Sequence, residues 1–173
     1  MAAQAPGRYP SHMTLHLDNL QEAVDLLLQR IPGTLRIGAP LGIGKPHRLL
    51  NALYQRVEKD PSRPLQIYTA LSLDPPSAAP GLERRFLQPF AQRHFGDDFP
   101  ALLYVQAMKR DALPAHIQVE EFYMQSGALL NSTQAQRSYT SLNYTAAAAG
   151  VAQRGANAIL QKVAHEPGGN RLS

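Results

Sequence analysis

The residues best suited to chemistry lie in a glycine-rich turn, residues 38–44, followed by Lys45 and Pro46. Gly42 and Gly44 let backbone N–H groups approach a ligand closely, and a helix that opens at Pro46 adds a favourable field for an anion. Lys45 is placed to supply a mobile positive charge beside that anion. A tight strand-to-helix turn with a solvent-exposed lysine explains the same spacing equally well.

Two phosphate-binding motifs resemble this turn but differ from it at defining positions. A nucleotide-binding P-loop needs glycine where Ala39 stands, and a serine or threonine ligand for Mg²⁺ where Pro46 stands. The dinucleotide fingerprint Gly-x-Gly-x-x-Gly does not occur in the chain. A non-catalytic module that binds a nucleotide or another small anion through the turn stays open as the alternative function.

Other candidate ligand residues are few. The loop residues Ser141, Asn143 and Tyr144 can hydrogen-bond a ligand, and residues 125–127 follow a predicted strand and can line a cleft. The chain has no cysteine, which excludes disulfides and cysteine chemistry. The histidines show no metal-ligand spacing, and we interpret all six as surface or structural residues. They are His12, His16, His47, His94, His116 and His165.

The elements that position these residues alternate along the chain. A helix over 20–31, capped by Asn19, precedes a strand at 35–37, and a second helix ends near Val57. The apolar run 65–73 is typical of a strand covered on both faces of a parallel sheet. This order predicts an α/β fold: an open, mainly parallel sheet with helices on both faces.

The second half of the chain continues the pattern. Helices over 82–95 and 102–110 form an insertion at one edge, before a strand at 116–124. Residues 126–145 show no clear period. An alanine-rich helix over 145–154 ends at Gly155, a left-handed C-cap, and a strand at 156–164 follows. A turn at 166–170 and three residues of a return strand, ending at Ser173, predict a fragment: a tail, 1–13, and one domain, 14–173.

Composition narrows the function classes. The net charge is +4, from 17 Lys and Arg against 13 Asp and Glu, and the basic residues are interleaved with acidic ones rather than clustered with aromatics. That pattern argues against a nucleic-acid partner. No apolar run of about 18 residues and no secretory leader are present, so we expect a protein without a membrane partner, in the cytoplasm.

A resemblance to a known family rests on three segments. Residues 38–54 resemble the first glycine loop and helix of the acetyl-CoA hydrolase/transferase family, which includes 4-hydroxybutyrate and succinyl-CoA:acetate CoA-transferases. Residues 67–73 resemble its next strand, and residues 141–145 resemble a later loop. The similarity covers roughly residues 9–173. It identifies the chain as an N-terminal half, with the active site between two related α/β halves.

The resemblance implies an enzyme that moves coenzyme A from an acyl-CoA to a small carboxylate or to water. A glutamate attacks the thioester, and a glutamyl-CoA intermediate follows; no cofactor is permanently bound. That glutamate belongs to the second half and is expected beyond Ser173, so this chain alone is expected to be inactive. The expected partners are the missing C-terminal domain and, through an exposed interdomain face, a second copy.

The resemblance also assigns binding residues within the chain. It implies that CoA is bound by Gly42, Gly44, Lys45, Pro46, Ser141, Asn143 and Tyr144.

Two glutamates inside the chain must be weighed as substitutes for the nucleophile. Glu120 and Glu121 lie within a predicted strand and match no nucleophile motif. We interpret them as a strand-end pair with at least one exposed carboxylate.

Overall fold

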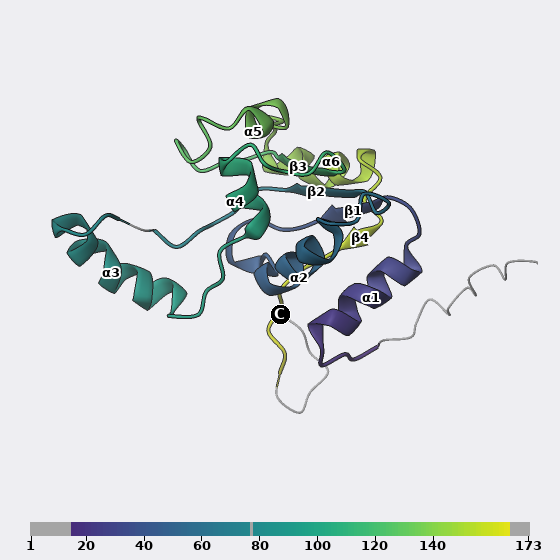
Figure 1. The fold of residues 1–173 in the computed structure, drawn as a ribbon, viewed down its shortest axis with the longest axis horizontal. Helices are drawn as coiled ribbons and strands as arrows, with labels where there is room; N and C mark the ends of the chain where they lie inside the picture. The colour runs from purple at the N-terminus through teal and green to yellow at the C-terminus, as the bar shows by residue number, and fades with distance from the viewer. Residues whose placement is uncertain (1–14, 77, 167–173) are drawn as a thin grey trace, which may run out of the picture.

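The protein folds around a four-stranded, all-parallel sheet with the strand order β3-β2-β1-β4 (Figure 1). The computed structural model describes residues 15–76 and 78–166. Helices flank the sheet on both faces, which confirms the predicted open parallel α/β fold. The strands are β1 (Leu35–Gly38), β2 (Leu65–Thr69), β3 (Ile117–Glu121) and β4 (Ala158–Ile159).

The first face of the sheet carries the larger core. The helices α1 (Leu20–Arg30), α2 (His47–Val57) and α4 (Leu103–Lys109) belong to it. In α2 the apolar residues recur at helical spacing, and Leu50, Leu53 and Val57 are all buried against the strands. Because α2 begins directly after the glycine-rich turn, this packing fixes the position of the turn at the end of β1.

The second face is covered by α6 (Ala147–Gln153), which packs on a small cluster of Tyr68, Ala70 and Phe122. A glycine makes this close packing possible. A Cβ atom on Gly150 would lie 2.8 Å from the hydroxyl oxygen of Tyr68. The short helix α5 (Thr133–Arg137) lies beside β3.

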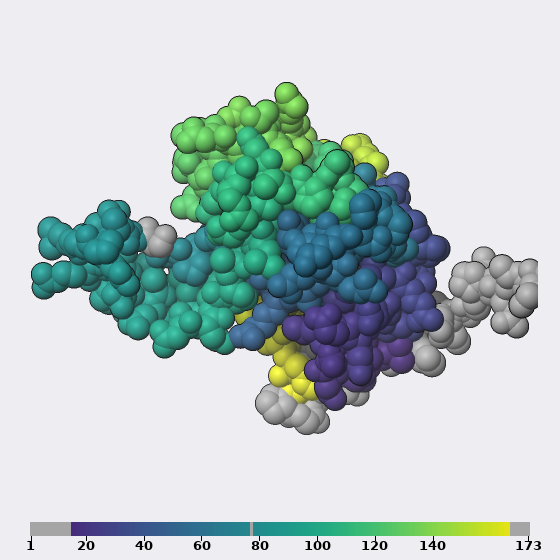
Figure 2. Space-filling model, in the orientation of Figure 1, coloured from purple at the N-terminus to yellow at the C-terminus, as the bar shows by residue number. Residues whose placement is uncertain are grey.

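The predicted insertion between β2 and β3 contains α3 (Leu82–Phe95) and α4, and α3 stands away from the body of the protein (Figure 2). None of its residues is buried. Leu82 and Phe86 are 82% and 79% exposed, although their spacing predicts an apolar helix face. The sequence pattern therefore identified the helix but not its lack of a packing partner.

Strand lengths differ most from the sequence predictions. The apolar run 65–73 forms a strand only as far as Thr69, because the chain turns out of the sheet at Leu71, whose φ is 41°. The predicted strands 116–124 and 156–164 shorten to β3 and to the two residues of β4. Apolar residues beyond these strand ends pack in loops, which periodicity does not distinguish from strands.

Local turns also correct the predictions. Residues 42–44, expected to lie outside regular structure, form a 3₁₀ turn with Gly42 at φ 59°, and α2 begins one residue later than predicted, with Pro46 as its N-cap. The helix predicted over 145–154 opens as a 3₁₀ turn at Tyr144–Ala146 before α6. The stretch without a clear period contains α5.

Helix caps follow the predicted chemistry. The side chain of Asn19 accepts a hydrogen bond from the backbone N–H of Gln21 at 2.8 Å, and Gly155 has the left-handed φ of 63°. No helix in the described part of the chain is both long and apolar enough to cross a bilayer.

Several predictions concern residues that the structure does not describe. The tail 1–13 with His12, the turn predicted after Glu166 and the return strand that ends at Ser173 all lie outside the described residues. The expectation of a fragment whose nucleophile follows Ser173 therefore stays a prediction.

Candidate functional site

The carboxyl ends of β1, β2 and β3 meet at one edge of the sheet, where a buried polar network joins them. Lys45 follows β1, Ser72 follows β2, and Glu121 ends β3. Tyr104 of α4 completes the network from the first face of the sheet. Ligands of open α/β sheets bind beyond this edge, so the network marks the region where a site is expected.

Lys45 is buried, with only 1% of its surface exposed. Its Nζ donates to Thr69 Oγ1 at 2.5 Å, to the carbonyl of Ala70 at 3.0 Å and to Ser72 Oγ at 3.1 Å. All three ammonium protons are therefore used. Burial lowers the pKa of Lys45 to about 8, although the charge of Glu121 acts in the opposite direction. The predictions of a mobile charge and of an exposed lysine are both wrong.

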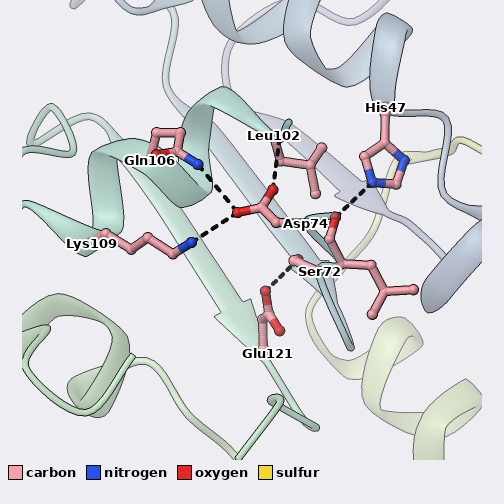
Figure 3. A network of polar contacts seen from close by, with 8 residues as sticks. His47, Ser72, Asp74, Leu102, Gln106, Lys109 and Glu121 are labelled. Atoms are coloured by element: carbon pink, nitrogen blue, oxygen red, sulfur yellow. Dashed lines mark hydrogen bonds and ion pairs between the residues drawn. The ribbon is translucent and has the colours of Figure 1, made fainter. Parts of the chain in front are cut away.

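The hydroxyl of Ser72 is saturated with hydrogen bonds. It donates a hydrogen bond to Glu121 Oε1 (Figure 3). The hydroxyl of Tyr104, 2.6 Å away, therefore donates to Ser72, as does Lys45. A serine oxygen that gives one hydrogen bond and accepts two has no lone pair left for attack on a substrate. Ser72 therefore organises this network rather than serving as a nucleophile in this arrangement.

Glu121 is 1% exposed and its carboxyl bonds Ser72. Burial raises the pKa of Glu121, while the charge of Lys45 and the hydrogen bonds from Ser72 oppose the rise. Burial also raises the pKa of Tyr104 well above its ordinary value. A buried lysine and a buried glutamate with pKa values shifted toward their neutral forms, joined here through Ser72, are typical of functional sites and also of structural ion pairs.

A second polar group borders the first. Asp74 accepts hydrogen bonds from Lys109 Nζ at 2.9 Å, Gln106 Nε2 at 3.2 Å and the backbone N–H of Leu102 at 3.4 Å (Figure 3). These contacts tie the loop after β2 to the start and end of α4.

His47 lies within hydrogen-bond distance of backbone carbonyls on both sides of the edge. Its Nδ1 is 2.9 Å from the carbonyl oxygen of Lys45. Its Nε2 is 3.2 Å from the carbonyl oxygen of Leu73, the contact drawn at His47 in Figure 3. The histidine thus holds the loops after β1 and β2 together, which fits the structural role expected for it.

Two adjoining cavities open beside these groups. The inner one, about 30 Å³, is lined in part by Ser72, Asp74, Lys109 and Glu121. The outer one, about 310 Å³, lies beyond β3, and the two share lining residues Met124, Gln125 and Leu129. The inner cavity has room for a water molecule, and the outer one has the size of a small-ligand pocket. Residues 125–127, singled out in the sequence, line the outer cavity.

The residues predicted to bind CoA fall into two segments, 42–46 and 141–144, which make separate contacts. The N–H of Gly42 donates to the carbonyl of Leu71 at 3.2 Å, so this amide is not directed at solvent. Asn143 caps the turn before α6, and Tyr144 packs edge-on against Phe122. Within the described ranges, no hydrogen bond or ring contact joins residues 141–144 to residues 42–46. CoA binding by these residues stays a prediction.

Glu120 belongs to the second face, where it pairs with Arg154. Arg154 lies over the ring of Tyr68, 4.2 Å from its centroid, and the hydroxyl of Tyr68 is buried without a hydrogen-bond partner. The Arg154 side chain holds the pKa of Glu120 below its ordinary value. The expected exposed carboxylate is therefore absent: Glu121 is buried, and Glu120 is held in a part-buried ion pair.

Sequence reasoning missed Ser72, Tyr104 and Lys109 as members of the site, and it did not select Asp74 as one. The one signal that could have placed Glu121 on the core face is its period-two spacing from the apolar Ile117 and Val119, which puts all three on one side of the strand. Among residues 15–76 and 78–166, no group of three metal-binding side chains comes together. Comparisons with protein-family models, curated proteins and solved structures gave no match.

Proposed function

We propose that this chain is the N-terminal half of an acyl-CoA hydrolase or CoA-transferase of the cytoplasm. In that enzyme CoA passes between an acyl-CoA thioester and a small carboxylate, or water, through a glutamyl-CoA intermediate. The chain supplies one wall of the site, and the nucleophilic glutamate comes from the second half, beyond Ser173. The resemblance of residues 38–54, 67–73 and 141–145 to that family motivates the proposal.

One observation carries the proposal: a ligand-sized cavity lies beside a polar network that offers no free nucleophile. Glu121 is buried and bonded to Ser72, Glu120 is paired with Arg154, and Ser72 is saturated. A half-site that binds substrate and leaves the attack to another domain needs both a ligand-sized cavity and the lack of a free nucleophile beside it. The glycine-rich turn contributes through Gly44, where an added Cβ would meet only Pro40, in ordinary van der Waals contact, rather than through the mobile lysine first expected.

The test of catalysis exploits the absence of cysteine. Release of CoA from acetyl-CoA can be followed with a thiol reagent without background from the protein, because the chain carries no thiol. We expect no release above the rate without protein. Turnover by this chain would contradict the assignment of the nucleophile to another domain.

The test of binding is calorimetric titration with CoA, ATP and NAD. We expect CoA to bind more tightly than either nucleotide. Gly44→Ala is the informative variant, because its φ is not left-handed and the new Cβ would contact Pro40 only at 3.5 Å, so the fold should survive while ligand approach is blocked. Leu82→Ala on the exposed α3 is the control and should bind CoA as the parent protein does.

Preference for ATP or NAD would favour the alternative, a non-catalytic nucleotide- or anion-binding module. Equal CoA affinity in the parent and in Gly44→Ala would remove the glycine-rich turn from the site.

A further inference from the structure

A row of three polar side chains crosses the second face of the sheet. Arg36 of β1 lies in register with Gln66 of β2, and Gln66 lies in register with Gln118 of β3. The neighbours of these residues along each strand belong to the core of the first face, so the three side chains point to the second face. Neighbouring strands are about 4.8 Å apart, so this polar row is about 10 Å wide.

Helix α6 does not bury the polar row. It packs on Tyr68 and Phe122, nearer the carboxyl ends of the strands. Arg36 and Gln66 are half-buried, and Gln118 is exposed. Because parallel sheets are almost always covered on both faces, an open stretch of this kind is a place where a ligand or another segment is expected.

The hydrogen-bond donors of the polar row are unused. Within the described residues, none of its three side chains makes a hydrogen bond or an ion pair. A guanidinium has five N–H donors, and each primary amide has two. Tyr68 lines the cavity beside the row, and its buried hydroxyl also lacks a partner in the described part of the chain. Native proteins pair most buried groups of this kind.

The charges around this cavity favour an anion. The cavity measures about 40 Å³, and its charged lining residues are Arg36, Glu120 and Arg154. The carboxylate of Glu120 is engaged, because it receives hydrogen bonds from Arg154 and Thr140. Of the three charged residues, only Arg36 has no partner among residues 15–76 and 78–166. An anion therefore finds a free guanidinium there, whereas a cation finds no free carboxylate.

We propose that this cavity binds the phosphate group of a small ligand. The guanidinium of Arg36 binds two phosphate oxygens side by side, and the amides of Gln66 and Gln118 donate to the third. A carboxylate has only two oxygens, which the guanidinium alone engages, so the two amides favour a tetrahedral oxyanion. The site lies on the opposite face of the sheet from the carboxyl of Glu121, and it goes beyond the proposed function.

The experiment is a titration of the ¹⁵N-labelled protein with inorganic phosphate, glycerol 3-phosphate and acetate at constant ionic strength. Backbone and side-chain N–H signals report the binding. We expect a phosphate Kd on the order of 1 mM, with shifts concentrated at Arg36, Gln66 and Gln118. Acetate should bind about tenfold more weakly, because it leaves the amides unpaired. Tighter binding of glycerol 3-phosphate would identify a phosphate ester as the ligand, and equal binding would identify the free ion.

Three variants test the residues of the site. Arg36→Gln should raise the phosphate Kd about tenfold, because it removes the charge-assisted hydrogen bonds, and it breaks no contact that holds the fold. Gln66→Leu should raise the phosphate Kd about threefold, through the loss of one neutral hydrogen bond. Arg93→Gln is the control, since it removes the same charge from the exposed α3, and it should leave the Kd unchanged.

Several results would overturn the site. They are acetate binding as tight as phosphate binding, equal effects of Arg36→Gln and Arg93→Gln, and shifts centred on residues 42–46. Displacement of phosphate from Arg36 by CoA would overturn the assignment to a separate ligand. Phosphate binding without CoA binding would leave this site standing and remove the proposed function. CoA binding without phosphate shifts at the polar row would do the reverse.

Discussion

At the scale of single residues, the lysine in the buried network matters because its proton is bound less tightly in the folded protein than in the unfolded chain. Three acceptors hold the ammonium of Lys45, yet loss of water lowers its pKa from 10.5 to about 8. Folding therefore carries a penalty for the charged form that the Glu121 charge only partly offsets.

This shift predicts a pH dependence of stability. Between about pH 8 and 9.5 the unfolded state holds the Lys45 proton more strongly than the folded state, so the free energy of unfolding should rise with pH. The gain is about 2 kcal/mol over that interval, and below pH 8 this contribution is flat. Urea unfolding at a series of pH values measures it. The measurement stops at about pH 9.5, because above it tyrosines ionise in the unfolded state and this ionisation opposes the gain in stability.

Lys45→Met is the matched variant for this prediction. It should lose the rise between pH 8 and 9.5, whereas Lys59→Met, which removes an exposed lysine, should keep it. A parent protein whose stability is flat or falling across the same interval would show that Lys45 titrates near its ordinary pKa.

At the scale of elements, the contact between α6 and β2 depends on one missing methyl group. Gly150 lies in the interior of α6, where alanine would normally stabilise the helix by about 1 kcal/mol. Here the added Cβ would stand 2.8 Å from the Tyr68 hydroxyl, so Gly150→Ala should instead destabilise the protein by about 1–3 kcal/mol. The free energy of unfolding in urea measures the change.

Removal of the Tyr68 hydroxyl is the change that should compensate for Gly150→Ala. Tyr68 Oη is buried with no partner, so Tyr68→Phe should be neutral or stabilising by about 1 kcal/mol. The double variant should recover the loss of Gly150→Ala, because the obstructing atom is gone. Strictly additive free energies of unfolding in this cycle would show that the hydroxyl is not what limits the approach of α6.

Elements with strong local patterns were predictable from the sequence. The helix 82–95 was predicted with its observed bounds, because its start, spacing and terminal glycine all lie within one segment. Strand ends were not, since Ala70 to Leu73 are as apolar as a strand while their hydrogen bonds go to other loops. Only half of the site was predictable. The loop that carries Lys45 was identified, but the three hydrogen-bond acceptors of the Lys45 ammonium lie 24 to 27 residues away in the sequence.

At the scale of the whole molecule, stability is unevenly distributed. The body has two packed faces, whereas α3 buries none of its residues and stands apart from the sheet (Figures 1 and 2). A helix of this length without tertiary packing opens readily in water.

Limited proteolysis should therefore begin in α3. We expect trypsin to cut first after Arg84, Arg85 or Arg93, as read by mass spectrometry of early fragments. Arg154, held by Glu120 and the Tyr68 ring, should stay intact until the body unfolds. Early cleavage at Arg154 together with an uncut α3 would mean that the insertion is protected in solution by a contact outside this chain's body.

The brevity of β4 has a consequence for assembly. An open sheet edge can pair with a strand of another molecule. At β4 such a strand could pair with only two residues, Ala158–Ile159. At the opposite margin, the last residue of β3 is bridged by the chain at Tyr139. The short ladder at β4 therefore limits growth of the sheet from copy to copy on that side.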